Sequence, residues 1–307
     1  MTLSLSQYRI IGMMSLLIVG KSLLLPSTGY ALPLVAQTQL TLPIATTALN
    51  QGLQAIQAGR VQDAIAAFRQ AIQLDPKLAP AHYNLGLALR QTGQLQPAAN
   101  AFYQATQVDP KFALAFANLG GALLEGNNLQ QASDYLERAL ELDPKLGFAH
   151  YNLGLVRQQQ RDWDRAIASF RKAIEYSKNA PEPAYHLGIT YLQQGNLNQA
   201  REAFARAIKI NPQYAEAHYN LGKIWFNQGK LPEALAAFRK AAEANPNYPH
   251  AYYGAGLVLM QQRRYTQAMQ VLQSARDLYQ AQGNLQWANY AQNLWQQAHK
   301  LNLSSPQ

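Results

Sequence analysis

The hexapeptide AHYNLG occurs three times, at residues 81–86, 149–154 and 217–222, with the same interval between successive copies. At half that interval lie two related stretches, AFANLG at 115–120 and PAYHLG at 183–188. A motif that returns at a fixed interval of about 20–50 residues is typical of repeat proteins, in which each copy is one supersecondary unit. The sequence therefore predicts an array of 34-residue units.

The interval holds over residues 45–282, which divide without a gap into seven blocks of equal length, repeats one to seven, the first at 45–78. Every repeat has glycine at place eight, alanine at places 20 and 27, and a large apolar residue at place 24. The place-eight glycines are Gly52, Gly86, Gly120, Gly154, Gly188, Gly222 and Gly256. Small residues at fixed places let helices approach closely, and the large residue fills the space between them. Each repeat is thus expected to be two short amphipathic helices.

Two places in each repeat hold residues that are typical of turns, place 15 and place 32. Place 15 holds Gly59, Gly93, Asn127, Gly195 and Gly229 in five repeats, which suits the left-handed backbone common after a helix. Arg161 and Arg263 occupy this place in repeats four and seven, so those two turns are expected to differ or to be strained. A proline at place 32 ends the second helix in five repeats. Lys178 replaces it in repeat four, which indicates an altered junction and not a domain boundary.

This pattern resembles the tetratricopeptide repeat (TPR), a 34-residue helix–turn–helix unit, over about three-quarters of the chain. The resemblance implies an all-α fold, a right-handed superhelical solenoid of seven repeats at 45–282. Beyond it, Leu285, Ala288, Ala291, Leu294, Ala298 and Leu301 form one helical stripe. Residues 283–301 are therefore expected to be a helix that caps the stack, followed by a disordered tail at 302–307.

Residues 1–36 have the features of a secretory signal peptide. A short apolar run, Ile10–Gly20, is followed by the small-residue motif GYA ending at Ala31, with Ala36 as a second candidate. The protein is thus expected to be exported, to the periplasm or another extracytoplasmic compartment, with residues 37–44 as a short linker. Lys21 interrupts the apolar stretch, so the alternative is an uncleaved membrane anchor at residues 10–25.

Composition argues against most kinds of chemistry. The chain has no cysteine, which removes disulfides and thiolate chemistry. Its net charge of +9 is spread over the sequence, which indicates a solvated surface and not a nucleic-acid-binding stripe. His82, His150 and His218 lie two repeats apart, too far to share a metal ion, since packed helices are about 8–10 Å apart and a zinc–nitrogen bond is about 2 Å. We therefore expect no enzyme activity, no metal, no cofactor and no small-molecule substrate.

Places five and six of the first helix carry the candidate binding residues. Place six has Asn50, Asn84, Asn118, Asn152, His186 and Asn220, then Gly254. Place five has Tyr83, Tyr151, Tyr185, Tyr219 and Tyr253. The asparagines resemble the ladder in the superhelical TPR domain of O-linked N-acetylglucosamine transferases, whose catalytic part has no counterpart here. That resemblance implies a concave groove in which amides hold the backbone of an extended peptide. The alternatives are that asparagine only reflects the repeat consensus, and that the tyrosines pack within the repeats.

The sequence thus predicts a non-enzymatic scaffold whose concave groove binds a protein or peptide partner outside the cytoplasm. A clamp for an acidic chain end is not expected, because place two holds no Lys or Arg and has Glu182 and Glu216 in two repeats. One alternative is an assembly scaffold that uses its convex surface or its ends. The other is binding of a cell-envelope polymer through the aromatic side chains. Association with a membrane is expected only if the N-terminus stays uncleaved.

Overall fold

The computed structural model describes residues 38–304, and this part of the chain is all-α. Its helices are α1 (Thr38–Gln57), α2 (Val61–Leu74), α3 (Ala79–Gln91), α4 (Leu95–Val108), α5 (Ala113–Glu125), α6 (Leu129–Leu142), α7 (Gly147–Gln159), α8 (Trp163–Tyr176), α9 (Glu182–Gln193), α10 (Leu197–Ile210), α11 (Ala215–Asn227), α12 (Leu231–Ala244), α13 (Pro249–Gln261), α14 (Tyr265–Ala281) and α15 (Leu285–Ser304). The odd-numbered helices up to α13 are the first helices of the repeats, and the even-numbered helices are the second helices. The fold is an all-α solenoid, as predicted.

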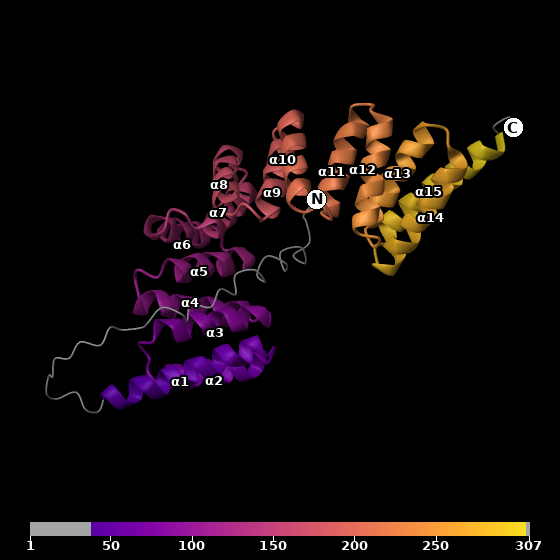
Figure 1. Cartoon of the computed structure of the whole chain (residues 1–307). Coiled ribbons are helices and arrows are strands. Elements are labelled where there is room, and N and C mark those ends of the chain that lie inside the picture. The colour runs from indigo at the N-terminus through magenta and orange to yellow at the C-terminus, as the bar shows by residue number, and fades with distance from the viewer. Residues whose placement is uncertain (1–37, 305–307) are drawn as a thin grey trace. The chain divides into compact units, whose positions relative to one another are not determined.

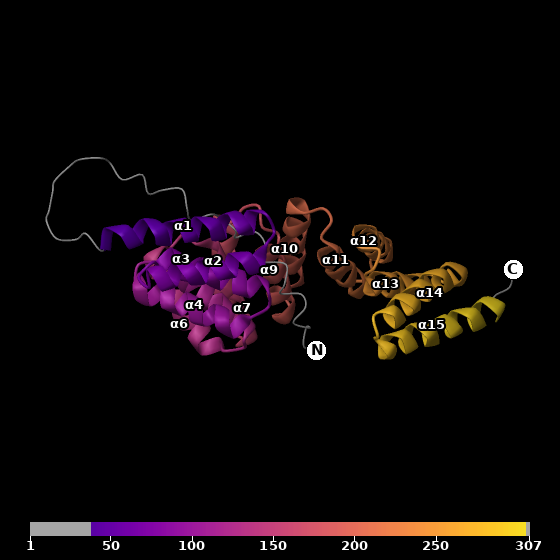
Figure 2. The same cartoon turned by 90° about the horizontal axis from the view of Figure 1, so that it is seen from below.

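The chain divides into two units, residues 1–160 and 161–307. Within each unit, helices that follow one another in sequence pack as neighbours (Figures 1 and 2). The sequence did not predict this division, which falls inside repeat four at the turn after α7. The altered junction at 179–183 lies instead within the second unit, where α8 packs against α9.

The ends of the helical region differ from the expected boundaries. Residues 38–44, expected to be a linker, are the start of α1, and residues 302–304, expected in a disordered tail, are the end of α15. The predicted signal peptide or anchor at 1–36 lies outside the described residues. No helix in the part that the structure describes combines the length and apolarity needed to cross a bilayer.

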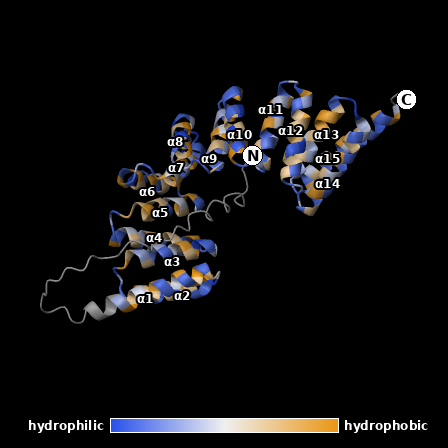
Figure 3. Cartoon of the chain, in the orientation of Figure 1, coloured by the Kyte–Doolittle hydropathy of each residue, from blue (hydrophilic) through white to orange (hydrophobic). Residues whose placement is uncertain are grey.

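Apolar and polar residues alternate along the helices (Figure 3), and the apolar side chains meet in the core of each unit. The place-eight glycine of the first helix lies against the place-24 side chain of the second. A Cβ atom on Gly86 would be 2.6 Å from the Phe102 ring, which is fully buried. On Gly222 it would be 2.7 Å from the Phe238 ring. Glycine is therefore required at place eight by a close approach of helix and ring.

The place-15 turns share one conformation whichever residue occupies them. Gly229 has φ 72° and Arg263 has φ 60°. In both turns the place-15 N–H donates to the carbonyl three residues earlier, at 2.9 Å from Gly229 to Phe226 and 3.0 Å from Arg263 to Met260. Arg161 also has a positive φ of 61°. The two arginine turns therefore do not differ from the glycine turns in backbone conformation. They are strained instead, because left-handed backbone is unfavourable for residues with a Cβ.

We predict that Arg263→Gly raises the free energy of unfolding by about 1 kcal/mol, because it removes the steric cost of a left-handed residue with a side chain. Urea denaturation followed by circular dichroism measures the change. The reciprocal variant Gly229→Arg should lower stability by a similar amount. Equal stabilities for Arg263→Gly and the parent protein would contradict the strain.

Candidate functional site

The place-six asparagines lie on the first helices, and four of the five are buried. Asn84 on α3 is 7% exposed, Asn118 on α5 1%, Asn152 on α7 5% and Asn220 on α11 6%. Asn50 on α1 is exposed. Burial of four of these residues corrects the expectation of a row of amides that lies open along a groove.

The amide nitrogen of three asparagines is engaged within its own helix. Nδ2 donates to a backbone carbonyl four residues earlier, from Asn84 to Pro80 at 2.7 Å, from Asn118 to Leu114 at 2.9 Å and from Asn220 to Glu216 at 2.8 Å. A carbonyl can only accept, so the –NH₂ group must face the helix and Oδ1 must point away from it. In the described region, Oδ1 of Asn84 and of Asn220 accepts no hydrogen bond. Asn220 thus offers an acceptor and not a donor–acceptor pair, because its Nδ2 donates twice, to Glu216 and to the Tyr185 hydroxyl, whereas Asn84 keeps one Nδ2 hydrogen beside its acceptor.

A second hydrogen bond joins place six to place five of the preceding repeat. The Tyr83 hydroxyl accepts from Nδ2 of Asn118 at 3.2 Å, and the Tyr185 hydroxyl accepts from Nδ2 of Asn220 at 3.5 Å. Asn152 follows a repeat that has Ala117 at place five. Its buried Nδ2 finds no hydrogen-bond partner in the region that the structure covers. Where tyrosine at place five is followed by asparagine at place six of the next repeat, as at Tyr83–Asn118 and Tyr185–Asn220, the two side chains therefore act as a pair across the repeat boundary.

In the first unit, Arg90 and Tyr83 make polar contacts with the next repeat. Arg90 Nε donates to Glu125 Oε1 at 3.0 Å, and Arg90 Nη1 donates to Oδ1 of Asn118 at 3.5 Å. Tyr83 is 2% exposed, and its ring packs at 4.9 Å from Phe112. Burial raises the pKa of Tyr83 to about 12, while the nearby Arg90 opposes the rise. Tyr83, together with Tyr151 at 3% exposed, is therefore mainly a packing residue.

The second unit presents its place-five residues to solvent. Tyr185, Tyr219 and Tyr253 are each partly exposed, and Trp287 on α15 continues them because it stands one repeat length after Tyr253. The Tyr253 and Trp287 rings meet edge to face, with centroids 5.4 Å apart. We call Tyr185, Tyr219, Tyr253 and Trp287 the aromatic row. Sequence reasoning missed Trp287 because it treated the last helix only as a cap, although the 34-residue spacing could have revealed it.

Polar groups accompany the aromatic row. Lys223 Nζ lies 5.6 Å from the centre of the Tyr219 ring, and burial lowers the pKa of Lys223. Burial, with a smaller contribution from Lys223, lowers the pKa of His250. A 2.6 Å hydrogen bond joins Nδ1 of His250 to the Tyr279 hydroxyl. The row is thus an aromatic surface with Lys223 as a neighbouring cation.

The two place-six residues that interrupt the asparagines have packing roles. The His186 ring stacks at 5.9 Å from Phe170, and burial lowers the pKa of His186 to about 4. A Cβ atom on Gly254 would be 2.7 Å from the Phe238 ring. Steric crowding therefore accounts for glycine at this place in repeat seven.

The recurrent histidines and aspartates stabilise turns. Nε2 of His82, His150 and His218 donates to the carbonyl of Pro76, Pro144 and Pro212, respectively, at 2.9–3.0 Å. Asp75, Asp109 and Asp143 each accept from the N–H two residues later, at 2.9–3.0 Å. Within residues 38–304 no three His, Asp or Glu side chains gather in a way that could hold a metal ion. The hydrogen bonds of these histidines and aspartates thus hold the turns that follow the second helices.

Two family models match the sequence. The one described as the cilia and flagella-associated protein 70 C-terminal domain, a TPR domain, matches residues 33–247. The one described as tetratricopeptide repeat matches residues 228–283. No curated protein matches the chain.

Several solved structures are similar. YrrB, described as a TPR protein with an unusual peptide-binding site, is 27% identical with a TM-score of 0.52, over 64% of this chain and 99% of YrrB. MamA is 25% identical with a TM-score of 0.50, over 56% of this chain and 94% of MamA. A tetratricopeptide repeat protein from Parabacteroides merdae ATCC 43184 is 18% identical with a TM-score of 0.60, over 80% of this chain and 98% of its own, and shares the fold.

Proposed function

Because this chain belongs to the tetratricopeptide repeat family, whose members generally bind protein or peptide partners, we propose that it is a non-enzymatic scaffold that binds an extended segment of a partner protein. The binding surface is the side of the second unit that carries the aromatic row. The signal-like sequence at 1–36 supports a location outside the cytoplasm.

The observation that carries the proposal is the partial exposure of the aromatic row at one 34-residue interval. Tyrosine and tryptophan bury much area at a small loss of conformational entropy, and they are enriched where proteins bind proteins. Oδ1 of Asn220 supplies an acceptor for a peptide N–H, and Lys223 supplies a cation beside the rings. An extended peptide advances about 3.3 Å per residue, so about three of its residues meet each repeat, given helix spacings of about 8–10 Å.

The similarity to YrrB supports a peptide as the ligand, because that protein is described as having a peptide-binding site. An envelope polymer is the second candidate, since aromatic rings also stack on sugar rings, and the aromatic row together with the exposed Tyr290 favours it. The first unit contributes less to either ligand, because its place-five tyrosines and most of its place-six asparagines are buried.

Photo-crosslinking in cells tests the proposal. A photoreactive phenylalanine at Tyr253 should capture a partner protein in an extracytoplasmic fraction, whereas the same residue at Tyr103, 41% exposed on the second helix α4, should not. With that partner purified, Tyr219→Ala combined with Trp287→Ala should weaken binding at least tenfold, because buried aromatic anchors are typically worth about 2 kcal/mol or more.

Melting curves of the double variant separate lost contacts from lost folding, and Tyr103→Ala serves as the matched surface control. Capture from Tyr103 alone would replace the proposal by the outer-surface scaffold. Capture of a glycan and no protein would replace it by the polymer binder.

A further inference from the structure

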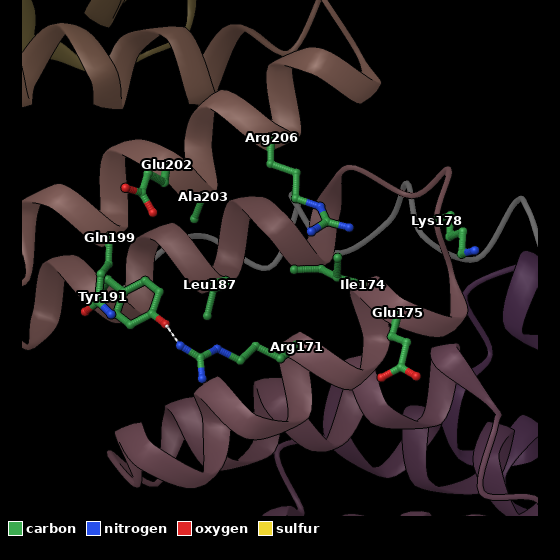
Figure 4. Close-up of a pocket in the computed structure, with 10 residues that line it drawn as sticks. All are labelled: Arg171, Ile174, Glu175, Lys178, Leu187, Tyr191, Gln199, Glu202, Ala203 and Arg206. Atoms are coloured by element: carbon green, nitrogen blue, oxygen red, sulfur yellow. Dashed lines mark hydrogen bonds between the residues drawn. The ribbon is translucent and has the colours of Figure 1, made fainter.

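A cavity of about 650 Å³ lies between the second helices α8 and α10, away from the aromatic row (Figure 4). Leu187 and Tyr191 of α9 contribute to its floor. None of its lining residues belongs to the aromatic row. Its size is within the range of about 300–1,000 Å³ that is usual for ligand sites.

The floor of this cavity is apolar and the rim is charged. Ile174, Leu187, Tyr191 and Ala203 line the floor and are 5–8% exposed. The ionisable residues of the rim are Arg171, Glu175, Lys178, Glu202 and Arg206, all exposed. An apolar floor with a few polar groups around it is the usual construction of a binding pocket.

None of these five charged side chains forms an ion pair with a described residue. Three cations and two carboxylates give the rim a charge of +1. Arg171 is held in place because its Nη2 donates to the Tyr191 hydroxyl at 2.7 Å. Arg206 extends from α10 towards the space above Ile174 (Figure 4) and makes no hydrogen bond to the described residues. The pocket therefore offers two guanidinium groups to an anion over an apolar surface.

The equivalent cavity two repeats later differs from this one in its volume and in the residues of its rim. The cavity between α12 and α14 has about 310 Å³. Val271 takes the place that Ala203 has in repeat five, and Ser274 takes the place of Arg206. At the altered junction, Lys178 stands where repeat six has Pro246. The larger volume and the positive rim thus belong to this position in the array and not to every repeat.

We propose that this cavity is a second binding site, which takes an acidic segment of a partner protein. A large apolar side chain of that segment lies over Leu187, and a neighbouring aspartate or glutamate pairs with Arg171 and Arg206. The charge of the rim selects an acidic segment, and the buried floor selects its apolar residue. This site is independent of the aromatic row, so the protein can bind through two surfaces at once.

The test uses purified full-length protein and two blocked tripeptides, acetyl-Glu-Phe-Glu-amide and acetyl-Gln-Phe-Gln-amide, with 4-fluorophenylalanine in the centre for ¹⁹F NMR titration. The acidic probe should bind at least tenfold more tightly than the neutral probe. Arg206→Gln should weaken the acidic probe about tenfold, and Ala203→Val should abolish its binding. Arg239→Gln, the counterpart of Arg171 in the smaller cavity, and the Tyr219→Ala, Trp287→Ala double variant should both bind as the parent does.

Ala203→Val is expected to fold, because repeat seven has valine at the same place, and unchanged thermal melting verifies this. Equal binding of the two probes, full binding by Ala203→Val, or no binding of the acidic probe would each overturn the second site. The proposed partner surface on the aromatic row would be unaffected by any of these results.

Discussion

Replacement of Phe102 by alanine should lower the free energy of unfolding by about 3–5 kcal/mol, the range found when a buried aromatic side chain is truncated. Phe102 is fully buried, and its ring fills the space that Gly86 leaves open. Its centroid lies 5.8 Å from that of the Tyr83 ring. Truncation therefore removes the contact between the two helices of repeat two and leaves a cavity that they cannot close.

The matched control is Phe102→Leu. Repeats three and seven have Leu136 and Leu272 at this place, and both are fully buried. Leucine keeps most of the volume, so the cost should stay below about 1.5 kcal/mol. Urea denaturation of the three proteins gives both values. Similar losses for alanine and leucine would mean that the ring does not carry the contact between these helices.

Stability should fall steeply between pH 10 and pH 12, where buried and partly buried tyrosines become ionised. Burial raises the pKa of Tyr83 and of Tyr219 to about 12, from the ordinary value of 10.0, and it also raises the pKa of Tyr185, Tyr214, Tyr248 and Tyr279. The folded state keeps the phenol protons that the unfolded state loses above about pH 10. The stability that depends on these protonated tyrosines is therefore fully present below pH 10, and it is lost as the pH rises through 12. For Tyr83 alone it amounts to about 2.7 kcal/mol, at 1.36 kcal/mol per pKa unit.

Absorbance at 295 nm and circular dichroism, followed together from pH 9 to pH 13, measure this effect. Phenolate absorbance and helix loss should rise in one cooperative step. Tyr219→Phe removes one partly buried phenol whose hydroxyl makes no hydrogen bond in the described region, so it should reduce the alkaline loss while leaving stability at pH 7 nearly unchanged. Smooth phenol titration with intact helices would contradict the burial.

Most of the fold could be predicted because its determinants are short-range and repeated. Glycine at place eight and a large residue at place 24 fix how two neighbouring helices meet, and a single sequence shows this seven times over. The strain at Arg263 could be predicted in the same way, because the other turns reveal the backbone that place 15 must adopt.

The candidate site was harder to predict. The sequence correctly places Asn118 on a first helix. It does not show that Nδ2 of Asn118 donates to Tyr83 and that Oδ1 accepts from Arg90, both on the first helix of the preceding repeat. Those contacts depend on the distance between neighbouring repeats. The cavity beside Ala203 was not predictable either, because its volume depends on side chains from three helices and on what they leave unfilled.

The hydrogen bond between a place-five tyrosine and the next repeat's asparagine has a consequence for how such an array can grow. A 34-residue segment cut at the turn between repeats separates Tyr83 from Asn118, or Tyr185 from Asn220. Inserting a copy whose place five is alanine, as in repeat three, leaves the following amide nitrogen buried and unsatisfied, as it is at Asn152. An engineered extension therefore keeps the bond across the new boundary only if the inserted copy has tyrosine at place five and the repeat after it has asparagine at place six, as repeats two and three do with Tyr83 and Asn118.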